Sequence, residues 1–296
     1  MNDATPATGL AATAPNPLAR LWQRTSRLDP RYLIAGLITL VLLVAQLRYH
    51  MFGGYWRLVI ALGVCMATEA VLSWFDRGRV VNLQSAYISG LSLTLLTRPQ
   101  GNALWPFAIG AFLAISSKYV LRYREQHLWN PTNFAISALL LVAPSKVAVL
   151  SHQFGNDLTT NLVIWAFGLL IAKRVGVLHI TLTYVASFLA LNGLRALALG
   201  QPLFPELAPI TGPMYQLFVF FMITDPRTVV KGRRRQMMVA VLIALTETLF
   251  RLLSDRGVPM PIAFSADPAL LSLAIVGPLA KWLDLRRTRV RAGSPS

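Results

Sequence analysis

The chain has 296 residues, of which 55% are hydrophobic and only 14% are charged, and its formal net charge is +16. Ordinary soluble domains contain about 25% charged residues, so this composition excludes a soluble fold and indicates an integral membrane protein in a lipid bilayer. The basic residues lie between apolar runs instead of on one face, which argues against a nucleic-acid partner. Because the chain has one cysteine, Cys65, and no paired histidine spacing, we expect no intramolecular disulfide and no metal site.

The first segment, residues 1–30, is rich in alanine, threonine and proline. It lacks the short apolar core and cleavage site of a signal peptide, so we expect a disordered cytoplasmic tail. The apolar windows that follow predict an all-α, polytopic membrane protein with about ten transmembrane helices. These windows lie near 32–47, 55–75, 84–97, 104–121, 131–149, 159–173, 177–197, 211–224, 236–253 and 268–284.

Lysine and arginine are unevenly distributed among the connecting segments. Most of the 28 basic residues fall in the amino-terminal tail, in alternate loops and in a basic tail at 286–296. If both termini lie on the same side of the membrane, these alternate loops lie on that side as well. Because an excess of basic residues marks the cytoplasmic side, we expect both termini to be cytoplasmic, in a protein of the plasma (inner) membrane.

A repeated proline pattern divides the chain into two halves, 31–150 and 151–285. In each half the third window ends at a proline, and an Asn-Pro or Asp-Pro pair opens the fifth. Five spans is an odd number, so the second half must enter the membrane from the opposite side, which predicts an inverted repeat of two five-helix halves. The alternative is that proline simply ends helices. The residues concerned are Pro99, Asn130 and Pro131 in the first half and Pro226, Asp267 and Pro268 in the second.

Two acids, Glu69 and Glu247, lie inside apolar windows, where a carboxylate is costly unless it has a partner. Glu247 has Arg251 four residues later, so an intrahelical ion pair is the plainer interpretation. Glu69 has no such neighbour, and its candidate partners are Lys118 and Arg122. A proton or ion site and a structural buried pair both stay open for these acids.

Three polar sites at helix ends are candidates for ligand binding. Lys118 ends the fourth span, where it either binds an anion or extends its ammonium group to the lipid headgroups. The second site, Asn130-Pro131-Thr132, opens the fifth span, and its free amides suit a phosphate or an electron-rich ring, although helix capping explains the same residues. The third site is Thr224-Asp225, at the end of the eighth span, which could also be a capped turn.

Catalytic motifs are absent from the sequence. It contains no phosphate-binding Gly-x-x-x-x-Gly-Lys loop, no Gly-x-Gly-x-x-Gly turn and no Gly-x-Ser-x-Gly nucleophile. We therefore expect no hydrolase, no ATP-driven pump and no catalytic residue. Haem is disfavoured as well, because facing histidine pairs are hard to build from His152 and His179.

Two stretches resemble the NqrB/RnfD family of membrane redox subunits. The first comprises residues 85–99 (SAYISGLSLTLLTRP), Lys118 and residues 128–132 (LWNPT). The second comprises residues 221–228 (FMITDPRT), Gly232-Arg233, and residues 255–257 and 263–265. The resemblance covers roughly residues 60–285, and the order of its pieces is more specific than any one of them.

The resemblance implies ten spans in two inverted halves, bound flavin, and electron transfer across the membrane together with other redox subunits. Ion-pumping members attach FMN through a Ser-Gly-Ala-Thr stretch, which this chain lacks. In the corresponding loop, 149–160, Thr159 and Thr160 match only by position, so we expect no covalent FMN. The chain is more similar to a divergent branch that includes proteins encoded among enediyne-biosynthesis genes.

The leading functional prediction is an electron-transport subunit, at most a non-hydrolytic redox subunit, that holds FMN or riboflavin non-covalently between its halves. The alternatives are an ion-coupled transporter that uses Glu69 and Glu247, or an assembly scaffold on the same fold. Aromatic residues near span ends, Trp105, Tyr119, Trp129 and Tyr215, could stack on a flavin ring or form an interfacial belt. The expected cofactor-binding residues are Lys118, Asn130, Pro131, Thr132, Thr224 and Asp225.

Overall fold

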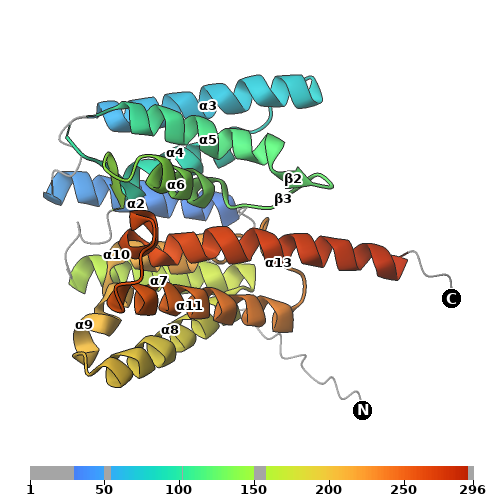
Figure 1. The fold of residues 1–296 in the computed structure, drawn as a ribbon. Helices are drawn as coiled ribbons and strands as arrows, with labels where there is room; N and C mark the ends of the chain where they lie inside the picture. The colour runs from blue at the N-terminus through green and yellow to red at the C-terminus, as the bar shows by residue number, and fades with distance from the viewer. Residues whose placement is uncertain (1–29, 50–54, 102, 150–157, 293–296) are drawn as a thin grey trace, which may run out of the picture.

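The computed structural model describes residues 30–49, 55–101, 103–149 and 158–292, and these are mainly helical, with only short strands (Figure 1). Residues 1–29 of the expected cytoplasmic tail and residues 150–157 of the loop at 149–160 lie outside the described residues. The last helix continues past its apolar window into the basic tail expected at 286–296, as far as Ala292.

Within the described residues, the first half of the chain contains five helices and two short strand pairs. The helices are α2 (Pro30–Tyr49), α3 (Trp56–Arg77), α4 (Gln84–Leu96), α5 (Trp105–Val120) and α6 (Pro131–Val142). Strand β1 (Thr97–Pro99) pairs antiparallel with β4 (Val147–Val149), and β2 (Arg122–Tyr123) pairs with β3 (Gln126–His127). The helix expected over 131–149 therefore ends at Val142, because its last residues pair with β1 instead.

The second half contains the remaining helices. They are α7 (Leu158–Val175), α8 (Leu178–Leu199), α9 (Leu203–Leu207), the 3-10 turn η1 (Ala208–Thr211), α10 (Pro213–Leu217), the π-helical turn η2 (Phe218–Met222), α11 (Arg233–Asp255), α12 (Ile262–Ala266) and α13 (Pro268–Ala292). Every predicted apolar window thus contains a helix within the described residues. Among the residues that the structure describes, four helices, α3, α8, α11 and α13, are long and apolar enough to cross a membrane by length and composition.

The distribution of polarity is that of a membrane protein. Large apolar side chains cover the outside, such as Phe75, Phe112 and Leu197, each more than half exposed. Charged side chains lie inside instead, including Glu69, Lys118 and Glu247. Such an exposed apolar surface would be a liability in water but matches the hydrocarbon of a bilayer. The coarse prediction of an all-α membrane protein agrees with this structure.

Two helix pairs form opposite sides of the molecule: α3 with α5, and α8 with α11 (Figure 1). Each pair is parallel, because contacts join its corresponding ends. Arg122, just after α5, bonds Asp76 near the end of α3, and His179 near the start of α8 contacts Gln236 near the start of α11. Both 22-residue helices, α3 and α8, end at a glycine with positive φ, Gly78 and Gly200, a conformation that glycine adopts without steric cost.

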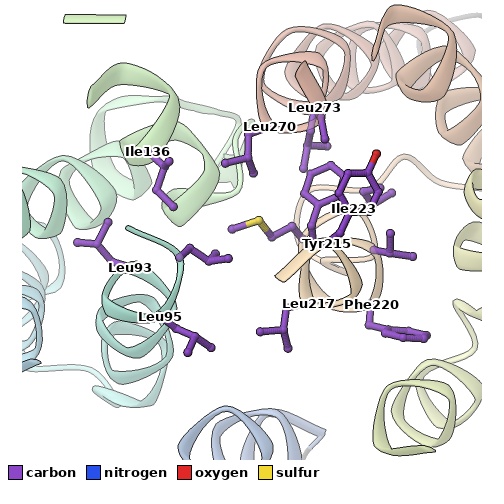
Figure 2. Close-up of a cluster of buried hydrophobic side chains, with 14 of the residues drawn as sticks. Leu93, Leu95, Ile136, Tyr215, Leu217, Phe220, Ile223, Leu270 and Leu273 are labelled. Carbon is purple, nitrogen blue, oxygen red and sulfur yellow. The ribbon is translucent and has the colours of Figure 1, made fainter. Parts of the chain in front are cut away.

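The core lies where these two sides meet. Figure 2 shows Leu93, Leu95 and Ile136 of α4 and α6 facing residues of α10, η2 and α13 across this seam. The facing residues include Tyr215, Leu217, Phe220, Leu270 and Leu273, all buried. The seam also holds polar contacts at one end, which form the candidate site.

Candidate functional site

A buried ion pair joins α3 to α5. Lys118 Nζ donates to Glu69 Oε2 at 2.7 Å and to Ser85 Oγ at 3.2 Å, and the two charged side chains are only 3% and 7% exposed. Tyr119 Oη donates to the other oxygen of Glu69 at 3.0 Å. Lys118 is thus the partner of Glu69, as predicted. The alternative of an ammonium group in the lipid headgroups is wrong, because the chain folds this lysine inward to neutralise the buried carboxylate.

The second contact joins the start of α6 to the turn after η2. Asn130 Oδ1 accepts from the backbone N–H of Asn133 at 3.0 Å, which caps α6, while Pro131 occupies the first turn. The Asn130 Nδ2 group donates to Asp225 Oδ2 at 3.0 Å. Asp225 Oδ1 in turn accepts from the backbone N–H of Arg227. Helix capping is therefore confirmed for Asn130, and the same side chain also links the two halves of the chain.

These contacts line a small cavity, the inner chamber, of about 150 Å³. Its polar wall contains five of the six predicted binding residues, Lys118, Asn130, Pro131, Thr132 and Asp225. The structure therefore brings together residues that are far apart in sequence. The apolar wall is formed by Ile34 and Ile38 of α2, Ile88 of α4, and Phe221 and Met222 of η2.

Thr224, the sixth predicted residue, does not line the inner chamber. Its side chain is buried and its hydroxyl donates to the backbone carbonyl of Phe220, four residues earlier. That bond satisfies the hydroxyl within the turn around η2. Thr224 therefore belongs to the turn that carries Asp225, and its side chain does not form part of the cavity wall.

A larger cavity, the basic vestibule, adjoins the inner chamber and has a volume of about 870 Å³. The two share Ser85, Lys118, His127, Pro226 and Arg227. The vestibule is walled on one side by the ends of α3 and α5 and by the β2–β3 hairpin, and on the other by the α7–α8 connection, residues 226–232 and α13. Both halves of the chain therefore contribute to it.

The charge of the vestibule is strongly positive. Six cationic side chains line it against two carboxylates, Glu69 and Glu125. Both carboxylates already have cationic partners, since Glu69 bonds Lys118 and Glu125 bonds Arg122. The wall therefore retains an excess of positive charge, which favours anions. The cations are Arg77, Lys118, Arg122, Arg227, Lys231 and Lys281.

His127 lies between the two cavities, on β3 and outside the long helices. Burial lowers the pKa of its imidazole, and the nearby cations Arg227 and Lys118 lower the pKa further, against an opposing effect of Asp225. Its Nδ1 lies 3.1 Å from the backbone carbonyl of Lys118. The ring is thus fixed by the end of α5 and favoured in its neutral form.

Several vestibule residues were not predicted from the sequence: His127, Arg227, Lys231 and Lys281. Arg227 lies within the FMITDPRT stretch, and Lys281 is a lone cation in the apolar part of the last window. These two positions were the sequence features that could have identified Arg227 and Lys281 as candidates. The sequence gives no such indication for Lys231. It lies beside the run of arginines at 233–235, and a basic residue there is explained equally well by its effect on membrane orientation.

A second buried network surrounds Glu247 of α11, which has no exposed surface. Its carboxylate accepts from Tyr184 Oη of α8, from Tyr215 Oη of α10 and from Arg251, whose Nη2 lies 2.9 Å away. The intrahelical pair predicted for Glu247 and Arg251 is therefore confirmed. Both carboxylate oxygens of Glu247 have donors, which matches a structural role.

The four aromatic candidates for ring stacking are separated in the structure. Tyr119 lines the vestibule, whereas Tyr215 belongs to the Glu247 network. Trp129 donates from Nε1 to the carbonyl of Ala274 at 2.8 Å, and Trp105 begins α5 at its other end. Of this set, Tyr119 is the residue in a position to contact a vestibule ligand.

The loop candidates for covalent attachment are only partly described. Thr159 lies in the first turn of α7 and is exposed, while the side chain of Thr160 and residues 150–157 lie outside the described residues. Within the described part of the chain, no group of three or more His, Cys, Asp or Glu side chains could hold a metal ion.

Comparison with known proteins does not add to these observations. No protein-family model matches the chain, and no curated protein matches it significantly. The resemblance to the NqrB/RnfD family therefore depends on the motifs quoted above and on where the structure puts them.

Proposed function

We propose that the chain is an NqrB/RnfD-like integral-membrane subunit for electron transport that holds a flavin non-covalently between its two halves. The observation that carries this proposal is the convergence of five predicted binding residues on the wall of the inner chamber, which adjoins the basic vestibule through Lys118 and other shared residues. A bound flavin would supply reversible electron transfer, which none of the side chains at this site can provide.

The size of the site supports a ligand as large as a flavin. Small-molecule pockets have volumes of about 300–1,000 Å³, and the vestibule, at about 870 Å³, lies in this range. The inner chamber, at about 150 Å³, is too small to hold a ligand of that size alone. The ring system therefore belongs in the vestibule, which Tyr119 lines with an aromatic side chain.

The arrangement of the helices supports two inverted halves. At the vestibule, the α3–α5 pair presents its carboxyl-terminal ends, marked by Arg77 and Arg122, whereas the α8–α11 pair presents the residues before its amino-terminal ends, Val177 and Gly232. The two pairs therefore run in opposite directions. Far from the vestibule, Arg195 of α8 bonds Asp255 of α11, much as Arg122 bonds Asp76 at the matching end of the other pair.

The short helices fit the same proposal. Helix α6 has 12 residues and so spans roughly 18 Å, less than the ~30 Å hydrocarbon core. Its capped start therefore lies inside the membrane, where irregular backbone is tolerated if it lines a cavity. We propose ten spans on this basis, with α6 and the α10–η2 segment as the broken ones, and with the basic vestibule on the cytoplasmic side.

The transporter alternative receives less support. Glu69 is bonded to Lys118 and Tyr119, and Glu247 is bonded to Arg251 and two tyrosines. A carboxylate that carries an ion or proton through the membrane must release its partners in each cycle, and these two are engaged on both oxygens. The structure offers no specific observation in favour of the scaffold alternative.

An absorption spectrum of the detergent-purified protein tests the proposal. We expect a yellow preparation whose oxidised-flavin absorbance bleaches on addition of dithionite and returns in air. After denaturation and filtration the flavin should pass into the filtrate, since no covalent attachment is expected. A preparation without flavin that also takes up neither FMN nor riboflavin when they are supplied would contradict the proposed function.

A matched pair of variants connects the spectrum to the site. Tyr119→Ala removes the aromatic face from the vestibule, whereas Trp105→Ala removes an aromatic side chain at the opposite end of the same helix. Flavin content should fall in Tyr119→Ala and not in Trp105→Ala. Equal flavin content in both variants would move the flavin away from the vestibule.

A further inference from the structure

We infer that the basic vestibule binds a phosphate group, with Arg227 and Lys231 as its principal charge contacts. The inference deepens the proposed function, on which it rests for the identity of the ligand, because it predicts selection of the phosphorylated flavin, FMN, over riboflavin. The phosphate site itself is argued from charge, unpaired donors and a helix end that are independent of any flavin.

The first observation is the unneutralised charge. Lys231 makes no ion pair within the described part of the chain, and its backbone N–H, not its ammonium group, contacts Asp284. Lys281 Nζ donates to the backbone carbonyl of Val229 at 2.9 Å, which leaves its charge without a carboxylate partner at bonding distance. Asp284, the nearest acid, is already bonded by Arg235. Like charges gathered on one wall are stabilised by an anion between them.

The second observation is a buried donor without an acceptor. Gln84 lines the vestibule, and its Nε2 group is buried with no hydrogen-bond partner among the described residues. An unsatisfied buried amide costs roughly 1–3 kcal/mol, so such groups are normally paired. A phosphate oxygen in the vestibule is the kind of acceptor that this amide lacks.

The third observation is the start of α11. This 23-residue helix begins after Gly232, which lines the vestibule and offers no side chain to cap the first turn. The free amides and the positive end of the helix dipole at this position favour a negative group. A glycine with φ of 93° allows the backbone to turn into the helix here without a side chain in the way.

The geometry orients a ligand with two chemically different ends. Arg227 lines both cavities, whereas Lys231, Gln84 and Gly232 line the vestibule alone. The apolar wall of isoleucines, phenylalanine and methionine belongs to the inner chamber. A ligand with an aromatic ring and a phosphate would therefore place its ring toward the inner chamber and its phosphate toward Lys231.

The experiment measures binding of three probes to the full-length protein, freed of endogenous flavin, in neutral detergent: FMN, riboflavin and pyrophosphate. We expect FMN to bind at least about tenfold more tightly than riboflavin, as one charged hydrogen-bonded contact implies. The preference should shrink as salt is added. Isothermal titration calorimetry gives the affinities of all three probes.

Variants assign the effect to the vestibule. Lys231→Gln and Arg227→Gln should each weaken FMN and pyrophosphate binding several-fold, and each should weaken FMN binding more than riboflavin binding. The matched control is Arg234→Gln, which removes one positive charge three residues from Lys231 at an exposed position that does not line the vestibule. Arg234→Gln should change none of the three affinities. An equal loss of FMN and pyrophosphate affinity in Arg234→Gln would show that the effect comes from net charge alone, and it would overturn the inference.

The outcomes separate this inference from the proposed function. Equal affinity for FMN and riboflavin, with no pyrophosphate binding, would overturn the phosphate site and keep the flavin site. Pyrophosphate binding that depends on Lys231, without binding of either flavin, would keep the phosphate site and overturn the proposed function. In nanodiscs, displacement of pyrophosphate by phosphatidylglycerol but not by phosphatidylcholine would identify the source of the phosphate as a lipid headgroup, and no displacement would identify a soluble ligand.

Discussion

Glu69 and Lys118 illustrate at the scale of single residues how this protein carries charge inside its apolar interior. Each side chain alone would be costly to bury, and together with Ser85 and Tyr119 they satisfy one another. The same lysine lines both cavities. Its charge is thus largely committed to Glu69, which is why Lys118 is not among the proposed principal phosphate contacts.

Breaking this pair should be more harmful than removing it. Lys118→Met leaves a buried, uncompensated carboxylate, and we expect a loss of about 3–5 kcal/mol in the free energy of unfolding. The double variant Glu69→Gln, Lys118→Met removes both charges and should recover much of that loss. Thermal unfolding in detergent, followed by circular dichroism, measures both. A single variant as stable as the wild type would contradict the buried pair.

His127 should make stability depend on pH. Burial beside Arg227 and Lys118 lowers the pKa of its imidazole in the folded state, and Asp225 opposes this only in part. The folded protein therefore binds fewer protons than the unfolded chain below the ordinary histidine pKa of about 6.5. The contribution of His127 is thus constant above that pH and becomes destabilising as the pH falls below it.

The variant His127→Gln should remove that part of the acid sensitivity. Melting temperatures of the wild type and of His127→Gln should differ little at about pH 8, and the wild type should fall more steeply toward about pH 5. Other acidic groups titrate over the same pH range, so the informative quantity is the difference in melting temperature between the wild type and His127→Gln at each pH. Parallel curves over the whole range would rule out His127 as a contributor.

At the scale of elements, α7 packs closely against η2, and η2 forms part of the second half's side of the seam. A Cβ atom on Gly168 of α7 would lie 2.5 Å from Cδ2 and 2.6 Å from Cγ of Phe220. The ring of Phe220 is also held edge-on by Trp165, with centroids 5.1 Å apart. There is consequently no room for a side chain at Gly168 unless the ring or the helix moves.

Gly168→Ala should therefore destabilise the protein by about 1–3 kcal/mol, the usual cost of overpacking a core. The matched control is Gly63→Ala in α3, where a Cβ atom would meet nothing within 4 Å. Because alanine favours helix, that control should be neutral or gain up to about 1 kcal/mol. Thermal unfolding compares the two, and an equal response would show that α7 and η2 do not pack as described.

The sequence predicted the elements better than their connections. The apolar windows located the helices, and Asn130-Pro131 predicted the start of α6, because capping is a local property. The β1–β4 pairing shortened α6, and the hydroxyl of Thr224 turned back to Phe220. Both depend on contacts with other segments or on local geometry, which the pattern of apolar residues does not encode.

The candidate site was likewise predictable only in part. Lys118, Asn130 and Asp225 could be identified because polar residues at the ends of apolar windows are few. Gln84 and Lys231 could not, since each is unremarkable in its own segment, and Lys281 offered only the signal of a lone cation in the last apolar window. They acquire a shared role only where the α3–α4 connection, the segment before α11, and α13 surround one cavity.

At the scale of the whole molecule, the proposal requires two halves that cross the membrane in opposite directions. Arg98 follows α4 and lies just before the start of α5, whereas Arg233 begins α11 beside the vestibule, where α5 ends. The two residues thus lie near opposite ends of α5, and both are exposed. In the proposed orientation, the end that carries Arg233 and its neighbouring positive residues faces the cytoplasm.

The most direct test is accessibility labelling of cysteines in intact cells. Cys65 is buried, and Cys65→Ala provides a background without native cysteine. We predict that Arg98→Cys is labelled by a membrane-impermeant maleimide from outside, whereas Arg233→Cys is labelled only after the cells are permeabilised. Labelling of both positions from the same side would contradict the inverted arrangement, and with it the site that the two halves are proposed to share.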